Sequence, residues 1–468
     1  MQPCSWKVNE PDMTKLYWLI FNILPMIGFF LAVMLLVYQN RTQRSPSSTV
    51  AWLLAILLVP YVGVPAYIIL GGRKMRRMTR IKGFLTADAG RTVEPSAEQG
   101  VRSIFPLRSG NEASLLATGE QAYAALMDLI EQARTSIDVT TFYLGNDKTG
   151  NSVLAALARK AGQGVRVRLL LDALGSFRTS RKQVAPLLAN GGSLAYFMPM
   201  MHLPFRGRAN LRNHRKMVIV DRATALFGGM NIAQEYMGPT VDKRRWYDMS
   251  MIVKGPVVAD LHQVFCSDWQ FAAGQSTVPE AGPGPIAGNA ATALQLVPSG
   301  PDVDGDPLYE SILTALFTAR QRVWITTPYF IPDEMLLKAI GMAAKRGVDV
   351  RIVVPEVSNH RLADLVRRSY LRQMHESGAV VCQFQPGVMH GKVILVDTSL
   401  CIVGSMNMDV RSFFLNYEIA MFIYDTRLLN ELERWIDGLI SQSFTGIRKT
   451  NVMIEFLEGV VRLLSPLL

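Results

Sequence analysis

Cysteine and histidine are scarce in this chain, and their scarcity excludes several kinds of site. The 468 residues contain only four cysteines and six histidines. The cysteines are scattered and form no C-x-x-C pair, so the sequence indicates neither a disulfide framework nor a cysteine-ligated zinc site. Scattered cysteines agree with a reducing, cytoplasmic environment. Two of the six histidines lie in a repeated motif, and we interpret the other four as surface or packing residues.

The N-terminus lacks the features of a cleaved secretory signal peptide. The residues before the first apolar run are only weakly basic, and that run is too long for a signal sequence. Two apolar runs, 16–38 and 50–70, are each long enough to cross a hydrocarbon core of about 30 Å as a helix. The link between them is short, so the sequence predicts a hairpin of two transmembrane helices, the second interrupted by Pro60, Gly63 and Pro65.

Basic residues are in excess and cluster after the second apolar run. The net charge is +11, and the cluster consists of Arg73, Lys74, Arg76, Arg77, Arg80 and Lys82. The positive-inside rule places this end of the hairpin in the cytoplasm, and Arg41 and Arg44 in the link weaken the bias without reversing it. The cluster can also hold anionic headgroups. The net charge suits an anionic membrane and nucleic acid equally, and the predicted hairpin favours the membrane.

One unusual motif, H-x-K-x4-D, occurs twice. The copies lie in NHRKMVIVD and MHGKVILVD and comprise His214, Lys216, Asp221, His390, Lys392 and Asp397. In both copies a glycine-containing turn follows, and an asparagine, Asn231 or Asn407, comes 17 residues after the histidine. Two copies with the same downstream spacing indicate a repeated functional unit, whereas a single H-x-K would be weak evidence.

The motif has the side chains that phosphoryl transfer requires. One histidine can attack phosphorus and form a phosphohistidine, while the other protonates the leaving alcohol and then deprotonates the incoming one. The lysines and asparagines can stabilise the negative charge on the phosphate oxygens, so we expect no metal ion and no other cofactor.

The residues of each motif predict the start of a buried strand. MVIVD and VILVD are apolar and β-branched, and the His and Lys, two residues apart, would face the same side. Asp221 and Asp397 fall at the far end of each strand. Direct catalytic contact and a structural role at a turn both remain open for these two carboxylates.

The repeat extends beyond the motif and predicts the fold class. VTTFYLGND resembles ITTPYFIPD with an offset of 186 residues. Helical periodicity at 120–134, 152–162, 307–320 and 334–346 alternates with buried strands, which indicates an α/β protein of two tandem sandwich halves related by a pseudo-twofold axis. The predicted domains are a membrane hairpin with its basic segment (1–82), a linker (83–110), the first half (111–277), a second linker (278–293), the second half (294–450) and a C-terminal amphipathic helix (451–468).

Two further acids take matching places near the end of each half. Asp248 in WYDMSMIVKG and Glu418 in NYEIAMFIYD each follow a tyrosine. A carboxylate bound to the remote ring nitrogen would orient a catalytic histidine and stabilise its charged form. We favour this orienting role over two exposed acids at strand starts, but the sequence does not say which carboxylate serves which histidine.

These motifs resemble the phospholipase D superfamily and, with TTPYFIPDEMLLKAIGMAAKRGVDVRIVVP and the membrane segment, its bacterial cardiolipin synthases. The resemblance implies two phospholipase D-like halves. It implies transfer of a phosphatidyl group between two phosphatidylglycerol molecules, giving cardiolipin and glycerol. It places catalytic roles on His214, Lys216, Asn231, His390, Lys392 and Asn407, with His214 as nucleophile and His390 as acid/base. Gly391 departs from the alanine common in the family, and we expect this small change to be without consequence.

The motifs, the charge and the predicted hairpin are compatible with several functions. The leading one is a multi-pass enzyme of the bacterial inner membrane, its catalytic domain in the cytoplasm, whose partners are phosphatidylglycerol, cardiolipin and anionic membrane lipid. A phospholipase D hydrolase or headgroup-exchange enzyme differs only in the acceptor and is the alternative. The hairpin argues against a nuclease, so no nucleic-acid partner is expected, and the intact motifs argue against a non-catalytic scaffold. A homodimer is compatible with the sequence but not required by it.

Overall fold

The computed structural model describes residues 46–63 apart from 60, residues 82, 83, 85 and 101, the ranges 103–198, 211–274 and 292–448, and scattered positions in 17–34 and at 453 and 458. The chain divides into two compact units, Met1–Arg73 with Leu463–Leu468, and Lys74–Arg462. The predicted linker at 278–293 and the predicted C-terminal helix at 451–468 lie almost wholly outside the described residues.

In the N-terminal unit, helix α2 spans Pro46–Leu58. Its side chains are strongly apolar, and Leu54, Leu57 and Leu58 are exposed. Among the described residues, no helix is both long enough and apolar enough to cross a membrane. The first predicted span, 16–38, is described only at scattered positions, so the hairpin stays a prediction.

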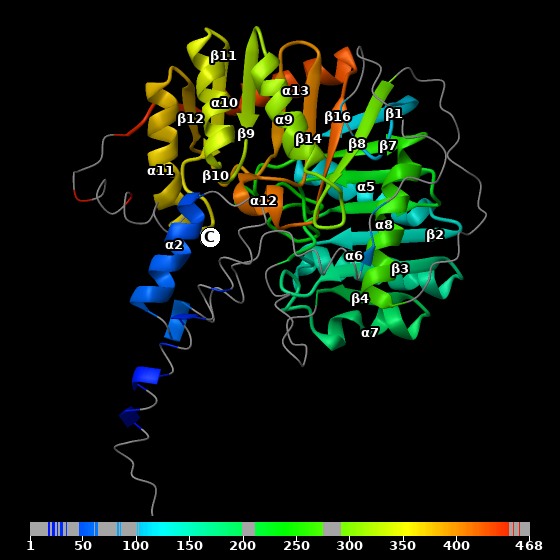
Figure 1. The fold of residues 1–468 in the computed structure, drawn as a ribbon. Coiled ribbons are helices and arrows are strands. Elements are labelled where there is room, and N and C mark those ends of the chain that lie inside the picture. The colour runs from blue at the N-terminus through cyan, green and yellow to red at the C-terminus, as the bar shows by residue number, and fades with distance from the viewer. Residues whose placement is uncertain are drawn as a thin grey trace, which may run out of the picture. The chain divides into compact units, whose positions relative to one another are not determined.

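The larger unit is built on one sheet of fifteen strands to which both halves of the repeat contribute (Figure 1). The first half supplies, in spatial order, β1 (Arg108–Leu116), β7 (Ser250–Lys254), β6 (Thr224–Gly228), β5 (Met217–Val220), β2 (Ser136–Thr141), β3 (Arg166–Asp172) and β4 (Ser193–Phe197). The second half supplies β8 (Thr292–Ser299), β16 (Glu418–Ile423), β14 (Leu400–Gly404), β13 (Val393–Val396), β9 (Arg322–Thr326), β11 (Asp349–Pro355), β12 (Val380–Phe384) and β17 (Ser443–Thr445). Apart from β17, the two orders correspond strand for strand.

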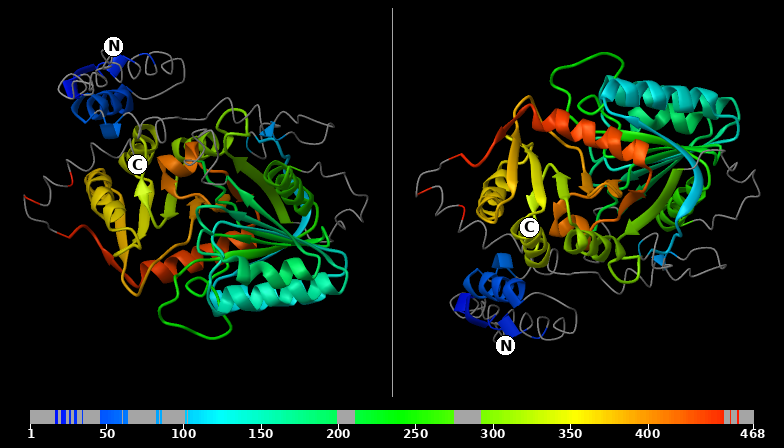
Figure 2. Two further views of the ribbon diagram at one scale, coloured as in Figure 1. Left: turned by 90° about the horizontal axis from the view of Figure 1, so that it is seen from below. Right: turned by 90° about the horizontal axis from the view of Figure 1, so that it is seen from above.

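The halves meet where β1 and β8 pair antiparallel. The prediction of two α/β halves is therefore confirmed, and Figure 2 shows the first half, in cyan and green, beside the second, in yellow to red. The sequence reading missed β1 and β8. The first is polar and contains Gly110, and the second contains Pro298, so neither has the pattern of a buried strand. The pairing of β1 with β8 across the two halves compensates for their weak strand-forming sequences.

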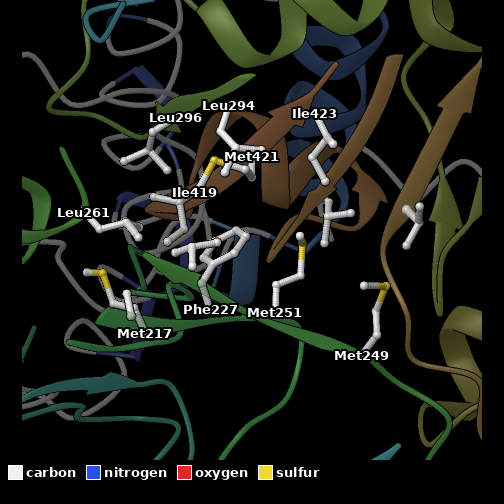
Figure 3. Close-up of a cluster of buried hydrophobic side chains, with 14 of the residues drawn as sticks. Met217, Phe227, Met249, Met251, Leu261, Leu294, Leu296, Ile419, Met421 and Ile423 are labelled. Atoms are coloured by element: carbon white, nitrogen blue, oxygen red, sulfur yellow. The ribbon is translucent and has the colours of Figure 1, made fainter. Parts of the chain in front are cut away.

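Helices cover both faces of the sheet. On one face lie α5 (Gly119–Gln132), α6 (Lys148–Gly162), α7 (Arg181–Ala189), α9 (Pro307–Thr318), α10 (Glu334–Lys345) and α11 (Arg361–Glu376), which pack on separate cores in the two halves. On the other face, α8 (Val257–Ala273) and α13 (Thr426–Ile440) cover a single core shared by both halves. Figure 3 shows part of this shared core, to which Met249 and Met251 of the first half and Ile419 and Met421 of the second half contribute. The four predicted helices are confirmed to within four residues at each end.

The motif strands alternate between these cores. Met217 and Ile219 of β5 face the shared core, while Val218 and Val220 face the core under α5 and α6. Burial on both faces explains why each motif is continuously apolar after its lysine.

Part of the predicted linker at 83–110 belongs to the core. Leu85 and Phe105 are buried in the shared cluster, and the side-chain amide of Gln295 donates hydrogen bonds to the carbonyls of Val101 and Phe105 at 2.8 and 3.0 Å. At these described positions the predicted linker packs against the sheet.

Candidate active site

The residues just before each motif strand pair with the opposite half. Asn213 forms a parallel bridge with Tyr417, and Met389 forms one with Tyr247. The His214 N–H donates to the Tyr417 carbonyl at 2.9 Å, and the His390 N–H donates to the Tyr247 carbonyl at 2.7 Å. The crossed bridges bring the two motifs together, since each tyrosine precedes one of the two predicted orienting acids.

Each histidine is bound by the carboxylate of the other half. His214 Nδ1 lies 3.0 and 3.1 Å from the two carboxylate oxygens of Glu418. His390 Nδ1 lies 2.7 Å from Asp248 Oδ2. Both acids are fully buried, so they are not the exposed acids of the alternative interpretation. The Nδ1 contact leaves Nε2 of each ring as the nitrogen that can face a substrate.

The two lysines lie beside the histidines. Lys216 Nζ donates to the His214 carbonyl at 2.7 Å, and Lys392 Nζ lies 2.8 Å from His390 Nδ1 and 3.3 Å from Nε2. Burial lowers the pKa of Lys216 to about 7 and that of Lys392 to about 8. An anionic phosphodiester placed between them would favour their charged forms.

Burial also shapes the titration of the histidines and their acids. Burial and the neighbouring lysines lower the pKa of His214 and lower that of His390 well below its usual range. Burial raises the pKa of Asp248 to about 6. Glu418 is also buried, but His214 and Lys216 outweigh the burial and lower its pKa. Both rings are therefore neutral near pH 7 in the empty site, the form in which Nε2 of His214 can attack. A bound anionic phosphodiester and the Asp248 carboxylate favour the protonated form of His390, which is the form that can give a proton to a leaving alcohol.

The two asparagines lie at the same edge of the sheet as the histidines. Asn231 Oδ1 accepts from the backbone N–H of Tyr143 at 3.3 Å and from the Thr141 hydroxyl at 3.4 Å. The Asn407 N–H donates to Ser412 Oγ at 3.2 Å, and its buried Oδ1 has no hydrogen-bond partner among the described residues. A buried amide with an unused polar atom is suited to a ligand.

The sequence reading missed residues that surround the histidines. Phe142 meets His214 edge-on with 5.1 Å between ring centres, and Tyr236 and Trp246 each lie 5.2 Å from His390. The hydroxyl of Ser405 donates to the Glu418 carboxylate. The sequence contains features that could have identified two of these residues. Phe142 lies in the repeated VTTFYLGND, and Ser405 lies in the glycine turn after the second motif.

Asp221 and Asp397 lie at the opposite end of the motif strands and do not join the site. Asp221 accepts the backbone N–H groups of residues 134–136 at 2.7 to 3.2 Å, and Asp397 accepts those of residues 320–322 at 2.7 to 3.1 Å. Both adopt a positive φ of 51°. Of the two roles left open by the sequence, these contacts support the structural one, since each carboxylate holds the turn that leads into β2 or β9.

We expect Asp221→Ala to destabilise the fold while leaving the chemical step intact. Loss of several hydrogen bonds to a partly exposed carboxylate should cost about 1.5 kcal/mol. Thermal unfolding should therefore begin at a lower temperature, whereas kcat at 25 °C should stay within about twofold of the parent because no reacting group is touched. Asp128→Ala, at an exposed position on α5, is the control. A large fall in kcat without a change in stability would return Asp221 to the catalytic machinery.

Gly391 matters more than the sequence suggested. A Cβ at this position would lie 2.3 Å from Cη2 of Trp435 on α13. This contact argues against the expectation that glycine in place of alanine is without consequence, because the indole ring occupies the space of the methyl group.

Accordingly, Gly391→Ala should destabilise the protein by about 1 to 3 kcal/mol, the range for overpacking. Gly438→Ala, on the same helix as Trp435 with open space around its Cα, should be neutral or stabilising. Denaturant titration of the two variants and of Gly391→Ala with Trp435→Leu measures the effect. Equal stability of Gly391→Ala and the parent would show that the indole moves at no cost.

Lys82 is buried beneath the first motif. Its Nζ lies 2.5 Å from both Asp268 and Asp302, and Arg215, the residue after His214, donates to Asp268 at 2.8 Å. Lys82 also lies 4.7 Å from the ring of Tyr417. A lysine in this position cannot reach a lipid headgroup, so its inclusion in the headgroup-binding cluster was wrong.

Lys82→Met should destabilise the protein by about 3 kcal/mol or more, because it leaves two buried carboxylates sharing one arginine. Lys148→Met, at an exposed position, is the control and should be close to neutral. Chemical denaturation of both variants checks the expectation. A Lys82→Met protein as stable as the parent would show that water replaces the ammonium.

The fold and the site define the class. A pseudo-twofold α/β sandwich whose two H-x-K motifs meet, each histidine bound to a carboxylate, is the architecture of the phospholipase D superfamily. The family model for the phospholipase D-like domain of cardiolipin synthase matches residues 126–269 and 312–440, and the phospholipase D-nuclease N-terminal model matches 29–72. The chain belongs to this cardiolipin synthase, phospholipase D-like family.

Curated relatives match over nearly the full length. The chain is 33% identical to cardiolipin synthase 1 of Bacillus anthracis, covering 91% of this chain and 90% of the relative. It is 32% identical to a cardiolipin synthase of Listeria welshimeri, covering 97% and 100%. Among solved structures, phosphatidylserine synthase of Haemophilus influenzae matches with a TM-score of 0.58 at 16% identity, covering 76% of this chain and 95% of that one. The last likeness concerns the fold alone.

Proposed function

We propose that the protein is a cardiolipin synthase that transfers a phosphatidyl group from one phosphatidylglycerol to another and releases glycerol. The observation that carries the proposal is the crossed pair of histidines, each bound through Nδ1 to a carboxylate of the other half. Family membership and the near full-length match to curated cardiolipin synthases support the choice of substrate.

In the first step, Nε2 of His214 attacks the phosphorus of phosphatidylglycerol. The bond from phosphorus to the headgroup glycerol oxygen breaks, and His390 gives that oxygen a proton. We assign the attack to His214 because its side chain is the more exposed of the two, 13% against 5%. His390, with Lys392 within 3.3 Å of both ring nitrogens, is better placed to move protons than to carry a covalent lipid.

In the second step, the headgroup hydroxyl of a second phosphatidylglycerol gives its proton to His390 and attacks the same phosphorus. The phosphorus–nitrogen bond breaks, and His214 leaves. Lys216, Lys392, Asn231 and Asn407 are proposed to bind the phosphate oxygens, whose charge develops in both steps. Glu418 and Asp248 orient the rings and stabilise their charged forms.

We further propose that the enzyme is anchored in the bacterial inner membrane by a hairpin of two helices, with the catalytic unit in the cytoplasm. The two apolar runs, the basic residues that follow them and the match of residues 29–72 to the N-terminal family model support this location.

The test is lipid mass spectrometry after incubation of the purified full-length protein with phosphatidylglycerol in detergent. Cardiolipin and free glycerol, both lost in His214→Ala, are the expected products. Phosphatidic acid would make water the acceptor and establish the hydrolase, the alternative that this geometry also permits. Unchanged phosphatidylglycerol, followed by cleavage of added DNA, would overturn the proposal in favour of a nuclease.

A further inference from the structure

Two symmetry-related loops expose large apolar side chains. The first follows β3 and carries Leu174 and Phe177, which are 39% and 62% exposed. The second follows β11, the counterpart of β3, and carries Val357, while Leu362 lies in the first turn of α11 directly after it; each is 65% exposed. Isolated exposed apolar residues are ordinary, but their recurrence at matching places in both halves indicates a shared purpose.

The first loop lies beside the first histidine. Ser176 Oγ donates to the carbonyl of Phe142 at 3.1 Å, and the Phe142 ring packs against His214. Asp172, which ends β3, accepts the N–H of Asn213 at 2.9 Å, next to the same histidine. Leu174 and Phe177 therefore lie at the rim of the candidate active site.

The second loop is attached to the strand end next to the second motif. Arg367 donates to the carbonyls of Pro328 and Glu356 at 3.3 and 2.8 Å, and the Tyr329 hydroxyl donates to Asn359 at 2.5 Å. Thr327, which precedes Pro328, accepts at its hydroxyl oxygen the N–H of Met408 at 3.1 Å, and Met408 directly follows Asn407. The apolar residues of this loop thus flank the site from the other half.

The loops are held in shape by their own hydrogen bonds. Asp172 Oδ1 accepts the N–H groups of Leu174 and Gly175, both at 2.9 Å. In the second loop, the Ser358 N–H donates to Asp364 at 3.0 Å, and the His360 N–H donates to Ser358 Oγ at 3.0 Å. The backbone is satisfied internally, so the exposure of the apolar side chains is built into the fold.

Positive charge accompanies these apolar side chains. Exposed basic residues lie within or directly after the loops, and they are Arg178, Arg181, Lys182, Arg361 and Arg368. The stretch 173–185 contains no acid, and the acids of the second loop are engaged, Glu356 with Arg448 and Asp364 with Arg367. Arg178 also lies over the ring of Phe177, 5.3 Å from its centroid. Apolar and aromatic side chains among exposed basic ones are typical of a surface that enters the headgroup region of an anionic bilayer.

We propose that residues 173–182 and 356–368 insert their apolar side chains into the interface of an anionic lipid bilayer on either side of the active site. These ranges, which we call the rim loops, comprise the two loops and the starts of α7 and α11. This inference rests on the proposed function and adds to it the surface through which the substrate leaves the membrane. The pseudo-twofold arrangement gives one loop to each histidine, as two lipid substrates require. The rim loops share no residue with the predicted membrane hairpin.

The first experiment uses the full-length protein in nanodiscs that contain phosphatidylglycerol. Cys4 and Cys266 are replaced by serine, and a fluorescent NBD group is attached to Phe177→Cys or Val357→Cys. Val380→Cys is the control, because it begins β12, which runs parallel to β11, and so lies at the strand ends opposite to the second loop. Lipids with a nitroxide near the headgroup should quench the probe at 177 and 357, and not at 380.

Absence of quenching at both rim positions would overturn the proposal. A blue-shifted probe that lipid nitroxides do not quench would overturn it too, and would show that a protein covers the surface. Neither readout needs turnover, so failure of the surface is distinguishable from failure of the proposed reaction.

The second experiment separates docking from chemistry. The double variant Phe177→Ser, Val357→Ser should raise the interfacial KM for phosphatidylglycerol in mixed micelles by roughly tenfold, since membrane affinity scales with buried apolar area. Its kcat, and its turnover of a short-chain, monomeric phosphatidylglycerol, should stay within about twofold of the parent because no catalytic group is changed. Val380→Ser is the control. An equal loss on the monomeric substrate would assign the loops to the catalytic site itself and overturn the docking role.

Discussion

His214→Ala and His390→Ala are each expected to abolish cardiolipin formation without unfolding the protein. The two histidines act as one unit, so removal of either should lower the rate by a factor on the order of 10⁶. His390 is buried and His214 is half-buried, yet neither belongs to the hydrophobic cores, and the sheet should form without them. His375→Ala, at an exposed position on α11, should retain full activity.

The two variants should differ in the covalent intermediate. His390→Ala, given a phosphatidyl substrate with a good leaving group in place of glycerol and quenched with denaturant at alkaline pH, should accumulate lipid on His214. The activated headgroup needs no proton to leave, and the second step lacks its base. His214→Ala should accumulate none. Mass spectrometry of the peptides locates the adduct. A lipid adduct on His390 would reverse the two roles, and near-normal turnover in either variant would reject a site shared by two histidines.

The second large effect concerns the acids that hold the histidines. Glu418→Gln and Asp248→Asn should each lower kcat by roughly 10³- to 10⁴-fold with little change in KM, as happens when the carboxylate that orients a catalytic histidine becomes an amide. The amide keeps the size of the side chain but cannot stabilise the imidazolium, and it permits the wrong tautomer.

The crossed pairing makes this prediction specific. Glu418→Gln should perturb the ring nitrogen signals of His214, and Asp248→Asn those of His390, in nitrogen NMR spectra of histidine-labelled protein. A carboxylate variant that perturbs the histidine of its own half would contradict the pairing seen in the structure.

Asp248 also predicts a pH dependence. Its pKa of about 6 is raised by burial, and its charged form is the one that supports protonated His390. Activity should therefore fall as the pH drops through about 6, because Asp248 takes up a proton there. Asp248→Asn should lose this acid limb along with most of its activity, whereas a limb unchanged in the variant would assign it to another group.

Much of the fold was accessible from local patterns. Apolar residues at helical spacing predict the helices α5, α6, α9 and α10. The sequence repeat predicts the two halves, because each copy contains the same apolar strand that must be buried. The sequence pattern did not predict strands β1 and β8, because they are buried by each other and by helices of both halves. The same holds for Lys82, which looks like part of a basic surface cluster and is instead paired with two aspartates from distant elements.

The sequence by itself determined the chemistry: two H-x-K motifs with matching asparagines, and two acids at equivalent places. It could do so because these residues recur at equivalent positions in both halves, and such spacing does not recur by chance. The tertiary structure alone decided which residues meet. It assigned Glu418 to His214 and Asp248 to His390, moved Asp221 and Asp397 out of the site, and gave Gly391 its steric role. The physical reason is that these contacts join residues as much as 204 positions apart, and only the pairing of strands across the two halves fixes such distances.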